Sequence, residues 1–288
     1  AMRHGNAMRL NGIDSEWMSR DEVARWIPNL DCSPQARFPI HGGLLQPRGG
    51  TVRHDAVAWG YARAADARGV DIIQQCEVTG LRLQGGAVTG VETNRGFIAT
   101  PRVGLAVAGH SSQLAAMAGI RLPIESHALQ AMVSEPVKPV LDTVVTSGAV
   151  HFYISQSDKG ELVMGGDLDF CNSFAQRGNL PIVEHVVAAC LTLFPDFGRL
   201  KLMRTWGGIM DMTLDGSPII GNLPVRGLTM TGGWCYGGFK ATPASGWLHA
   251  HTMATGAPHA LNSAFSLERF TQGALLDEKG AGPTAWAH

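Results

Sequence analysis

Short runs of apolar and β-branched residues, separated by glycine-containing turns, recur along most of the chain and predict strands. In the first half these runs cover 70–75, 76–83, 87–93, 97–100 and 102–107. Later runs cover 129–135, 150–154, 162–166, 201–210 and 228–231. The clustering of strands into two groups predicts two sheets that belong to different parts of the fold.

The first 30 residues have a helical pattern of apolar and polar positions. Asp14 and Ser15 are suitable caps for one helix, because their side chains accept hydrogen bonds from the first free N–H groups. Ser19 suits the start of the next helix, since Glu22 three residues later completes a capping box.

Longer helical patterns lie further along the chain, over 56–68, 113–117 and 180–194. Asp55 suits the start of the first of these helices and Gly69 its C-terminal end. Pro195 ends the third, because proline lacks the N–H group that a helix interior requires. Strands and helices together predict a mixed α/β protein.

Composition narrows the function classes. The chain has 288 residues and 45% hydrophobic content, enough for one large domain or two. Its 36 glycines fall in separate turns, which is more typical of a cofactor-binding α/β protein than of a linker. The net charge of −1 gives no reason to expect nucleic acid or an anionic membrane as a partner. No apolar run approaches the ~20 residues of a membrane span.

The five cysteines are scattered and form no C-x-x-C pair: Cys32, Cys76, Cys171, Cys190 and Cys235. An odd number without framework spacing favours reduced thiols in a cytoplasmic protein. The same scatter argues against a metal site.

A glycine-rich turn at 232–238 follows the strand predicted over 228–231. The next helix is expected to begin near Thr242-Pro243, because threonine is a good N-cap and proline suits the first helical turn. A glycine turn before a helix brings backbone N–H groups and a positive dipole end close to a ligand. Lys240 adds a mobile cation on that turn. A tight turn without any ligand is the alternative interpretation.

Two motifs carry a resemblance. D-G-x-P-I-I-G at 215–221 is followed by T-G-G-x-x-x-G-G-F-K-x-x-P at 231–243. The pair resembles the C-terminal signature of the glycine oxidase and sarcosine oxidase family of flavoenzymes. The second motif is most similar to the β subunits of the heterotetrameric members. The resemblance extends over almost the whole chain, from residue 6 to residue 267.

The resemblance implies a D-amino-acid-oxidase-like FAD-binding fold, α/β overall, interleaved with an antiparallel substrate sheet of α+β character. The expected segments are a helical substrate-domain piece at 1–37, an FAD-binding piece with FMN attachment at 38–120, a substrate sheet at 121–205, a C-terminal FAD-binding piece at 206–270 and a tail at 271–288. Relatives carry G-x-G-x-x-G near their N-terminus, and these 288 residues contain none. We therefore expect the N-terminal Rossmann βαβ unit to be missing, which leaves independent FAD binding open.

The resemblance also implies two flavins. Monomeric relatives attach FAD to a cysteine where this chain has Gly207-Gly208-Ile209, so FAD is expected to be noncovalent. The positions expected to contact cofactor are Gly42, Gly43, Ala108, Gly109, Gly208, Gly237, Gly238 and Phe239.

In the heterotetrameric relatives, the histidine of an Arg-His pair carries covalent FMN, and the match here is Arg53-His54. An imidazole nitrogen is a plausible nucleophile, and Arg53 is suited to hold negative charge on the flavin. An ordinary helix-start residue is the alternative interpretation of His54. His41, which also stands beside a Gly-Gly pair, is the alternative attachment residue.

For the substrate, we expect Lys240 to bind the carboxylate of a secondary amino acid such as sarcosine, because an anion at this turn meets the ammonium, backbone donors and a helix N-terminus together. The alternatives are an exposed turn lysine, or one that contacts the flavin or oxygen. Tyr153 matches a position that faces substrate in monomeric relatives, and a buried sheet aromatic explains it equally well. Those relatives carry basic residues after the tyrosine block, whereas 162–167 has none. The residue that activates oxygen is therefore not assigned.

The implied reaction is oxidation of sarcosine by FAD, with electrons passed to FMN and then to O₂ to give hydrogen peroxide. The one-carbon unit would go to tetrahydrofolate on a partner subunit, and an α subunit and small subunits are the expected partners. One alternative is another amine or imino-acid oxidase or dehydrogenase, acting on glycine, dimethylglycine or proline. A second alternative is a non-catalytic fragment that only builds the surroundings of FMN.

Overall fold

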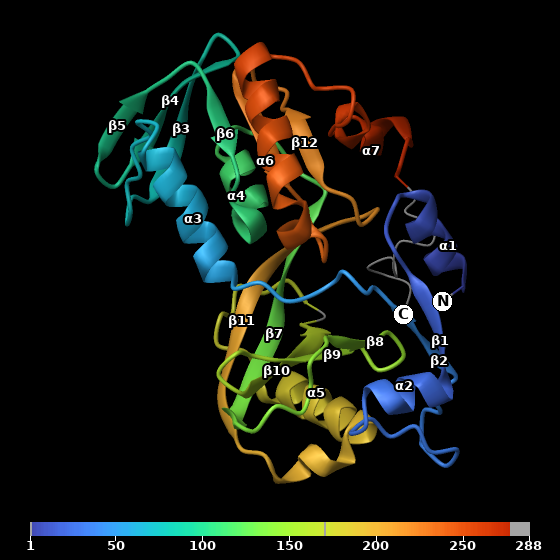
Figure 1. Cartoon of the computed structure of the whole chain (residues 1–288). Helices are drawn as coiled ribbons and strands as arrows, with labels where there is room; N and C mark the ends of the chain where they lie inside the picture. Colours follow the sequence, from blue (N-terminus) through green and yellow to red (C-terminus); the bar gives the residue numbers. More distant parts are fainter. Residues whose placement is uncertain (1, 170, 277–288) are drawn as a thin grey trace. The chain divides into compact units, whose positions relative to one another are not determined.

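The computed structural model describes residues 2–169 and 171–276, which form two compact units. Among the described residues, unit 1 comprises 2–51, 127–169 and 171–209, and unit 2 comprises 52–126 and 210–276. The chain passes from one unit to the other after Thr51 and again within the long strands β7 (Ile124–Pro136) and β11 (Leu202–Thr213) (Figure 1). Each unit is therefore built from segments that are far apart in sequence. Most of the tail expected at 271–288, namely 277–288, lies outside the described residues.

Unit 1 is organised around a five-stranded sheet in the order β11-β7-β10-β9-β8. Besides β7 and β11 it contains β8 (Val145–Ser147), β9 (Phe152–Gln156) and β10 (Glu161–Leu168). β10 pairs antiparallel with both of its neighbours, and β8 pairs antiparallel with β9. The strands predicted over 129–135, 150–154 and 162–166 are confirmed by β7, β9 and β10.

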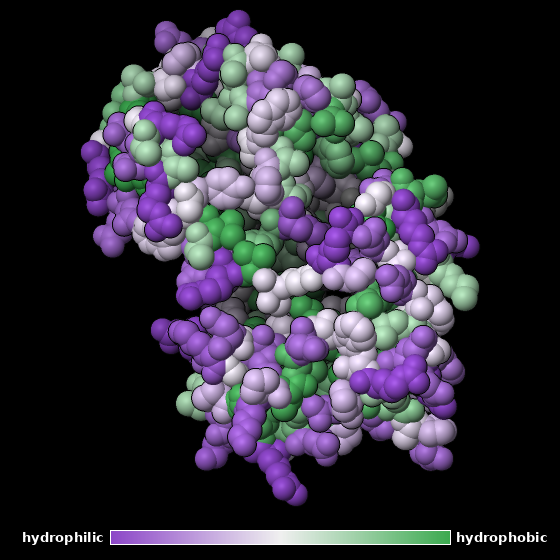
Figure 2. Space-filling model, in the orientation of Figure 1, coloured by the Kyte–Doolittle hydropathy of each residue, from purple (hydrophilic) through white to green (hydrophobic). Residues whose placement is uncertain are grey.

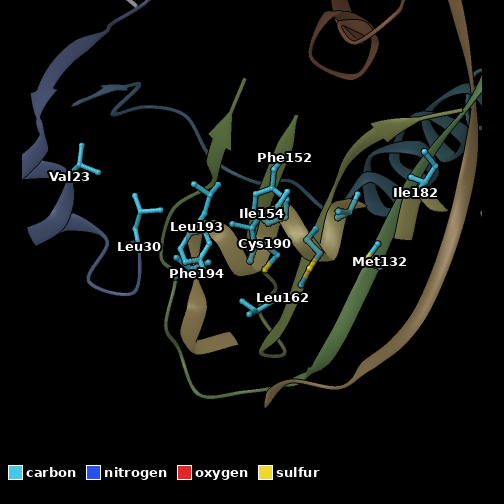
Figure 3. Close-up of a cluster of buried hydrophobic side chains, with 14 residues drawn as sticks. Val23, Leu30, Met132, Phe152, Ile154, Leu162, Ile182, Cys190, Leu193 and Phe194 are labelled. Carbon is cyan, nitrogen blue, oxygen red and sulfur yellow. The ribbon is translucent and has the colours of Figure 1, made fainter. Parts of the chain in front are cut away.

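Helix α5 (Leu180–Leu193) packs against β9 and β10 and closes the core of unit 1. Its start is fixed by Asn179, whose side chain accepts a hydrogen bond from the Ile182 N–H at 3.1 Å. Buried positions recur at helical spacing, namely Ile182, Val186, Ala189, Cys190 and Leu193. Figure 3 shows Cys190 and Leu193 of this helix beside Phe152 and Ile154 of the sheet, and the same cluster includes Val23 and Leu30 of the N-terminal segment. Each aliphatic side chain buried in this way contributes roughly 1.5–3 kcal/mol.

The N-terminal part of unit 1 contains α1 (Met2–Leu10), β1 (Glu16–Ser19), α2 (Arg20–Trp26) and β2 (Gly42–Leu45). The capping box of Ser19 and Glu22 is confirmed. The prediction of a helix after Asp14 and Ser15 is wrong, because the residues that follow form strand β1, which pairs antiparallel with β2. The Ser15 hydroxyl instead donates to the Gly5 carbonyl at 2.9 Å.

Unit 2 contains two three-stranded sheets. One is antiparallel and joins β3 (Val78–Gln84), β4 (Ala87–Thr93) and β5 (Gly96–Ala99). The other has the order β12-β13-β6, with β12 (Ile219–Asn222), β13 (Leu228–Gly232) and β6 (Val103–Leu105). In it, β13 runs antiparallel to β12 and parallel to β6.

The helices of unit 2 are α3 (His54–Asp66), α4 (Ser111–Ala116), α6 (Gly238–Thr255) and α7 (Arg269–Gln272). Short 3₁₀ turns lie at Ala108–His110 and Ser263–Phe265 in this unit, and at Pro195–Arg199 in unit 1. The core of unit 2 is formed by β4, β6, β12 and β13 with α4, and its most deeply buried members include Val88, Ala115, Ile219, Leu228 and Met230.

The strand predicted over 70–75 is wrong. No strand is present there, and Val70, Ile72 and Ile73 are 52%, 49% and 52% exposed, because no described strand pairs with this stretch. Helix α3 likewise has no buried residue, and its Trp59 and Tyr61 are exposed. Figure 2 shows apolar residues at the surface among hydrophilic ones on the face that it draws.

Among the residues that the structure describes, no helix is both long enough and apolar enough to cross a membrane.

Candidate functional site

Strands β6 and β13 lie side by side in unit 2, and each leads into a segment that carries predicted cofactor contacts. Their parallel register pairs Leu228 with Val103 and Met230 with Leu105. The carboxyl ends of parallel strands meet at one edge of a sheet, which is where α/β proteins bind ligands. The Ala108-Gly109 segment and the glycine-rich turn at 232–238 are thereby brought together.

The two segments approach closely at Gly232. A Cβ atom on Gly232 would lie 2.8 Å from the Ser111 hydroxyl oxygen, so a larger residue would force the Ser111 side chain to move. Ala108 has the left-handed backbone angle φ = 44°, which is uncommon for a residue with a Cβ atom. The Ser111 hydroxyl donates to the Ala108 carbonyl at 2.6 Å and stabilises this conformation. Strained backbone of this kind concentrates at functional sites.

Helix α6 begins earlier than the sequence predicts. Gly237 is its N-cap and Gly238 its first residue, so the expected start at Thr242-Pro243 is wrong. Pro243 lies inside the helix, and the Thr242 hydroxyl donates to the Gly238 carbonyl at 3.3 Å. The Thr-Pro pair matches a helix-start signal, but here the Gly-Gly pair before it already has helical geometry.

Lys240 is therefore the third residue of α6 and lies in its first turn, not on the preceding loop. Its side chain is exposed and forms no hydrogen bond or ion pair with the residues that the structure describes. The N–H groups of Gly238, Phe239 and Lys240 have no acceptor within the helix, because the first turn lacks the preceding carbonyls. A cation and several backbone donors thus occupy the same helix end, an arrangement that attracts an anion.

The donors of the preceding turn are already occupied, by Asp211 at the end of β11. One carboxylate oxygen of Asp211 accepts from the Gly233 N–H, the other accepts from the Trp234 N–H at 3.2 Å, and its backbone carbonyl accepts from the Cys235 N–H at 3.0 Å. Burial raises the pKa of Asp211, and the hydrogen bonds from Gly233 and Trp234 oppose that effect. Sequence reasoning missed Asp211, although a single carboxylate between Met210 and Met212 in an apolar strand is a signal for a buried polar role.

Cys235 completes the attachment of this turn to β11. Its sulfur accepts from the Thr213 N–H at 3.4 Å, and its backbone has the left-handed angle φ = 49°. Burial raises the pKa of the Cys235 thiol, so the group is neutral near pH 7.

His54 and Arg53 are at the start of α3 in unit 2, where Arg53 is the N-cap and His54 the first residue. Both side chains are exposed, and the Arg53 guanidinium forms an ion pair with Asp55 at 3.1 Å. The hydrogen bond from Arg53 lowers the pKa of Asp55. His41, the alternative attachment residue, is also exposed but belongs to unit 1. Both imidazoles are therefore accessible to a large group.

Tyr153 lies on β9 in unit 1, directly opposite Gly165 of β10. A Cβ atom at Gly165 would lie 2.8 Å from the Tyr153 hydroxyl, so this glycine makes room for the phenol. The register of β10 shifts between Gly165 and Leu168, a β-bulge of the kind that is frequent beside active sites. Burial raises the pKa of Tyr153, which keeps its hydroxyl protonated and able to donate.

The remaining predicted glycines, Gly42, Gly43 and Gly208, also belong to unit 1. A Cβ atom at Gly42 would meet the Trp17 ring and the Met18 carbonyl at 2.5 Å, so the pairing of β1 and β2 by itself requires glycine there. A Cβ atom at Gly43 would lie 3.0 Å from the Val23 side chain. Gly208 is exposed on β11, with open space around its Cβ position.

The edge formed by β6 and β13 fits an FAD group in its chemistry. It offers the left-handed backbone at Ala108 and glycines that allow close approach of the cofactor. Ala108, Gly109, Gly237, Gly238 and Phe239 are the predicted cofactor contacts that lie at this edge.

Comparisons with known proteins agree with this geometry. The family model of FAD dependent oxidoreductases matches residues 1–252. The chain is 63% identical to the sarcosine oxidase subunit beta of Rhizobium meliloti over 280 residues, covering 97% of this chain and 67% of that protein. It is 50% identical to the sarcosine oxidase subunit beta of an Arthrobacter species, covering 99% of this chain and 70% of that protein. The chain thus spans about two thirds of the length of these relatives.

A solved structure with the same fold is the L-proline dehydrogenase of P. horikoshii. It superposes with a TM-score of 0.84 at 24% identity, over 92% of this chain and 71% of that protein. The D-amino-acid-oxidase-like fold expected from the two motifs is confirmed. The chain belongs to the FAD dependent oxidoreductase family and, within it, to the group of sarcosine oxidase beta subunits.

Proposed function

We propose that this chain oxidises sarcosine to glycine with FAD, as one subunit of a larger enzyme. Support comes from the 63% and 50% identity to sarcosine oxidase beta subunits. FAD, when bound, supplies the acceptor for the two electrons that leave the N-methyl C–H bond. Hydrolysis of the resulting imine gives glycine and formaldehyde, and O₂ takes up the electrons to give hydrogen peroxide.

The observation that carries this proposal is the position of Lys240 at the N-terminal end of α6. Sarcosine is a zwitterion whose carboxylate takes no part in the oxidation, so it is the natural point of attachment. Lys240 and the N–H groups beside it bind this carboxylate and thereby orient the N-methyl group. Tyr153 is the second residue that the resemblance assigns to substrate, and burial keeps its hydroxyl protonated and able to donate.

The finer parts of the proposal concern a second flavin and the partners. FMN is attached to His54, whose exposed position at the start of α3 allows attachment of a bulky group. Arg53 beside it holds negative charge on that flavin. An α subunit, small subunits and tetrahydrofolate on a partner subunit complete the enzyme, which works in the cytoplasm.

The proposal is tested with the chain produced together with its partner subunits. Peroxide formation is measured with sarcosine, glycine, dimethylglycine and proline at equal concentrations. We expect sarcosine to give the highest kcat/KM, and tetrahydrofolate to capture the one-carbon unit. Preference for proline or dimethylglycine would assign a different substrate. A folded assembly without flavin would support the non-catalytic alternative.

A further inference from the structure

The turn between β13 and α6 is held by a carboxylate of the protein itself. Three successive backbone N–H groups, those of Gly233, Trp234 and Cys235, all donate to Asp211. Successive N–H groups of this kind can bind an anion; here the first two meet the Asp211 carboxylate and the third meets its backbone carbonyl. The donors left for a ligand therefore begin only at Gly238, in the first turn of α6.

Asp211 has no cationic partner among the residues that the structure describes, and the residue is only 4% exposed. A buried carboxylate without a cation is costly unless hydrogen bonds compensate for the loss of water. The turn supplies those bonds. These hydrogen bonds couple the buried carboxylate to the backbone of the turn.

We infer that Asp211 is a positioning residue, which fixes the turn at 232–238 and so orients the first turn of α6, where Lys240 lies. This inference rests on the proposed role of Lys240 in binding the substrate carboxylate. Asp211 acts through the backbone of the turn and does not touch substrate. Its two carboxylate oxygens match two N–H groups, and no neutral side chain of the same size offers two such acceptors.

The side-chain amide introduced by Asp211→Asn would provide only one acceptor oxygen and would turn its NH₂ group towards a second N–H donor. One backbone donor is then left buried and unsatisfied. Asp211→Ala removes both acceptors and should have the larger effect. Asp167→Asn is the control, because Asp167 is an equally buried aspartate in unit 1 that pairs with His185 and the Leu168 N–H and does not contact the turn.

The first measurement is amide hydrogen exchange in the assembled enzyme. In the wild type, Gly233 and Trp234 should exchange slowly, whereas Gly238 to Lys240 should become protected only when methylthioacetate, a carboxylate inhibitor, is added. Asp211→Asn should speed exchange at Gly233 and Trp234 by about 10-fold or more, the equivalent of one lost hydrogen bond of about 1.4 kcal/mol. Rapid exchange at these two amides in the wild type would overturn the inference without any variant.

The second measurement separates positioning from general stability. For Asp211→Asn we expect the KM for sarcosine and the inhibition constant of methylthioacetate to rise together by about 10-fold, with a smaller change in kcat. The Asp167→Asn control should leave both constants unchanged. Equal increases in both variants, or none in Asp211→Asn, would refute the inference. If the wild type oxidises a different amine, the proposed function fails while the exchange rates still decide the role of Asp211.

Discussion

Arg269 and Asp215 form a two-pronged ion pair inside unit 2, although they are 54 residues apart in sequence. The guanidinium Nε donates to one carboxylate oxygen at 2.8 Å and an Nη donates to the other at 2.9 Å. Both side chains are 2% exposed. Arg269 also donates to the Ser217 carbonyl at 2.7 Å. The aspartate of the D-G-x-P-I-I-G motif thus anchors the C-terminal part of unit 2.

We predict that Asp215→Asn destabilises the protein by about 3–5 kcal/mol, because it leaves the Arg269 charge buried without its partner. The control is Arg20→Met, which breaks an exposed ion pair with Asp21 and should cost at most about 1 kcal/mol. Denaturant midpoints measured for the two variants test this. A loss at Asp215 as small as that at Arg20 would contradict the prediction.

The same pair makes stability depend on pH. Burial alone would raise the pKa of Asp215, but the hydrogen bonds and charge of Arg269, with the N–H groups of Leu276 and Ser217, outweigh it and lower the pKa. An acid whose pKa is lowered by folding stabilises the protein above its unfolded pKa of about 3.9 and loses that contribution as pH falls further. In Arg269→Met, the melting temperature should fall less steeply with decreasing pH below about pH 4 than it does in the wild type. An unchanged acid slope would show that other carboxylates govern it.

Several elements follow from local sequence rules alone. The helix expected over 180–194 is present as α5 (Leu180–Leu193), since the pattern of apolar residues, the Asn179 cap and Pro195 agree with one another. The stretch at 70–75 is rich in β-branched residues and was predicted as a strand, but it forms none. A strand needs a partner, and propensity does not reveal whether one is available.

The candidate site was predictable in its position but not in its internal contacts. The strand, the glycines and Lys240 are adjacent in sequence, so their proximity follows from the chain itself. Asp211 reaches the turn from a strand more than 20 residues earlier, a contact that only the fold reveals. The start of α6 was missed because glycine fits both a loop and a helix end, and local rules favoured Thr242-Pro243.

Gly165→Ala should disturb Tyr153. The added Cβ would lie 2.7 Å from the Gln130 carbonyl and 2.8 Å from the Tyr153 hydroxyl, so the phenol must move. We expect a loss of about 1–3 kcal/mol in stability, as in other overpacked cores, and a higher KM for sarcosine. Gly148→Ala, whose Cβ would have open space in the same unit, is the control for both measurements and should change neither. If the KM of Gly165→Ala stays at the wild-type value, Tyr153 does not contact the substrate.

His54→Ala should abolish acid-stable flavin, whereas His41→Ala should retain it. Both histidines are exposed, so neither variant removes packing from a core. The measurement is the yellow colour that remains with the protein after acid precipitation, together with a melting curve to verify folding. The opposite pattern would identify His41 as the residue that carries FMN. Retention of covalent flavin in both variants would exclude both histidines.

Lys240→Met should weaken binding of the substrate carboxylate while leaving the fold intact, because the side chain is exposed and forms no hydrogen bond or ion pair with the described residues. A charge-assisted hydrogen bond contributes roughly 1.5–3 kcal/mol, which corresponds to about 10- to 100-fold in affinity. Solvent around an exposed cation screens the interaction, so the lower end of that range is expected. The dissociation constants of sarcosine and methylthioacetate should therefore rise together in the assembled, FAD-loaded enzyme.

The matched control is Lys159→Met, since Lys159 is also exposed but lies in the hairpin between β9 and β10. Loss of a positive charge in general would weaken binding equally in both variants, whereas loss of a specific contact would do so only in Lys240→Met. Oxygen provides the other test, because a cation near a flavin also assists its reoxidation electrostatically. Both dissociation constants could stay at wild-type values in Lys240→Met while reoxidation by O₂ slows. That result would show that Lys240 assists the reaction with O₂ and that the N–H groups of α6 alone bind the carboxylate.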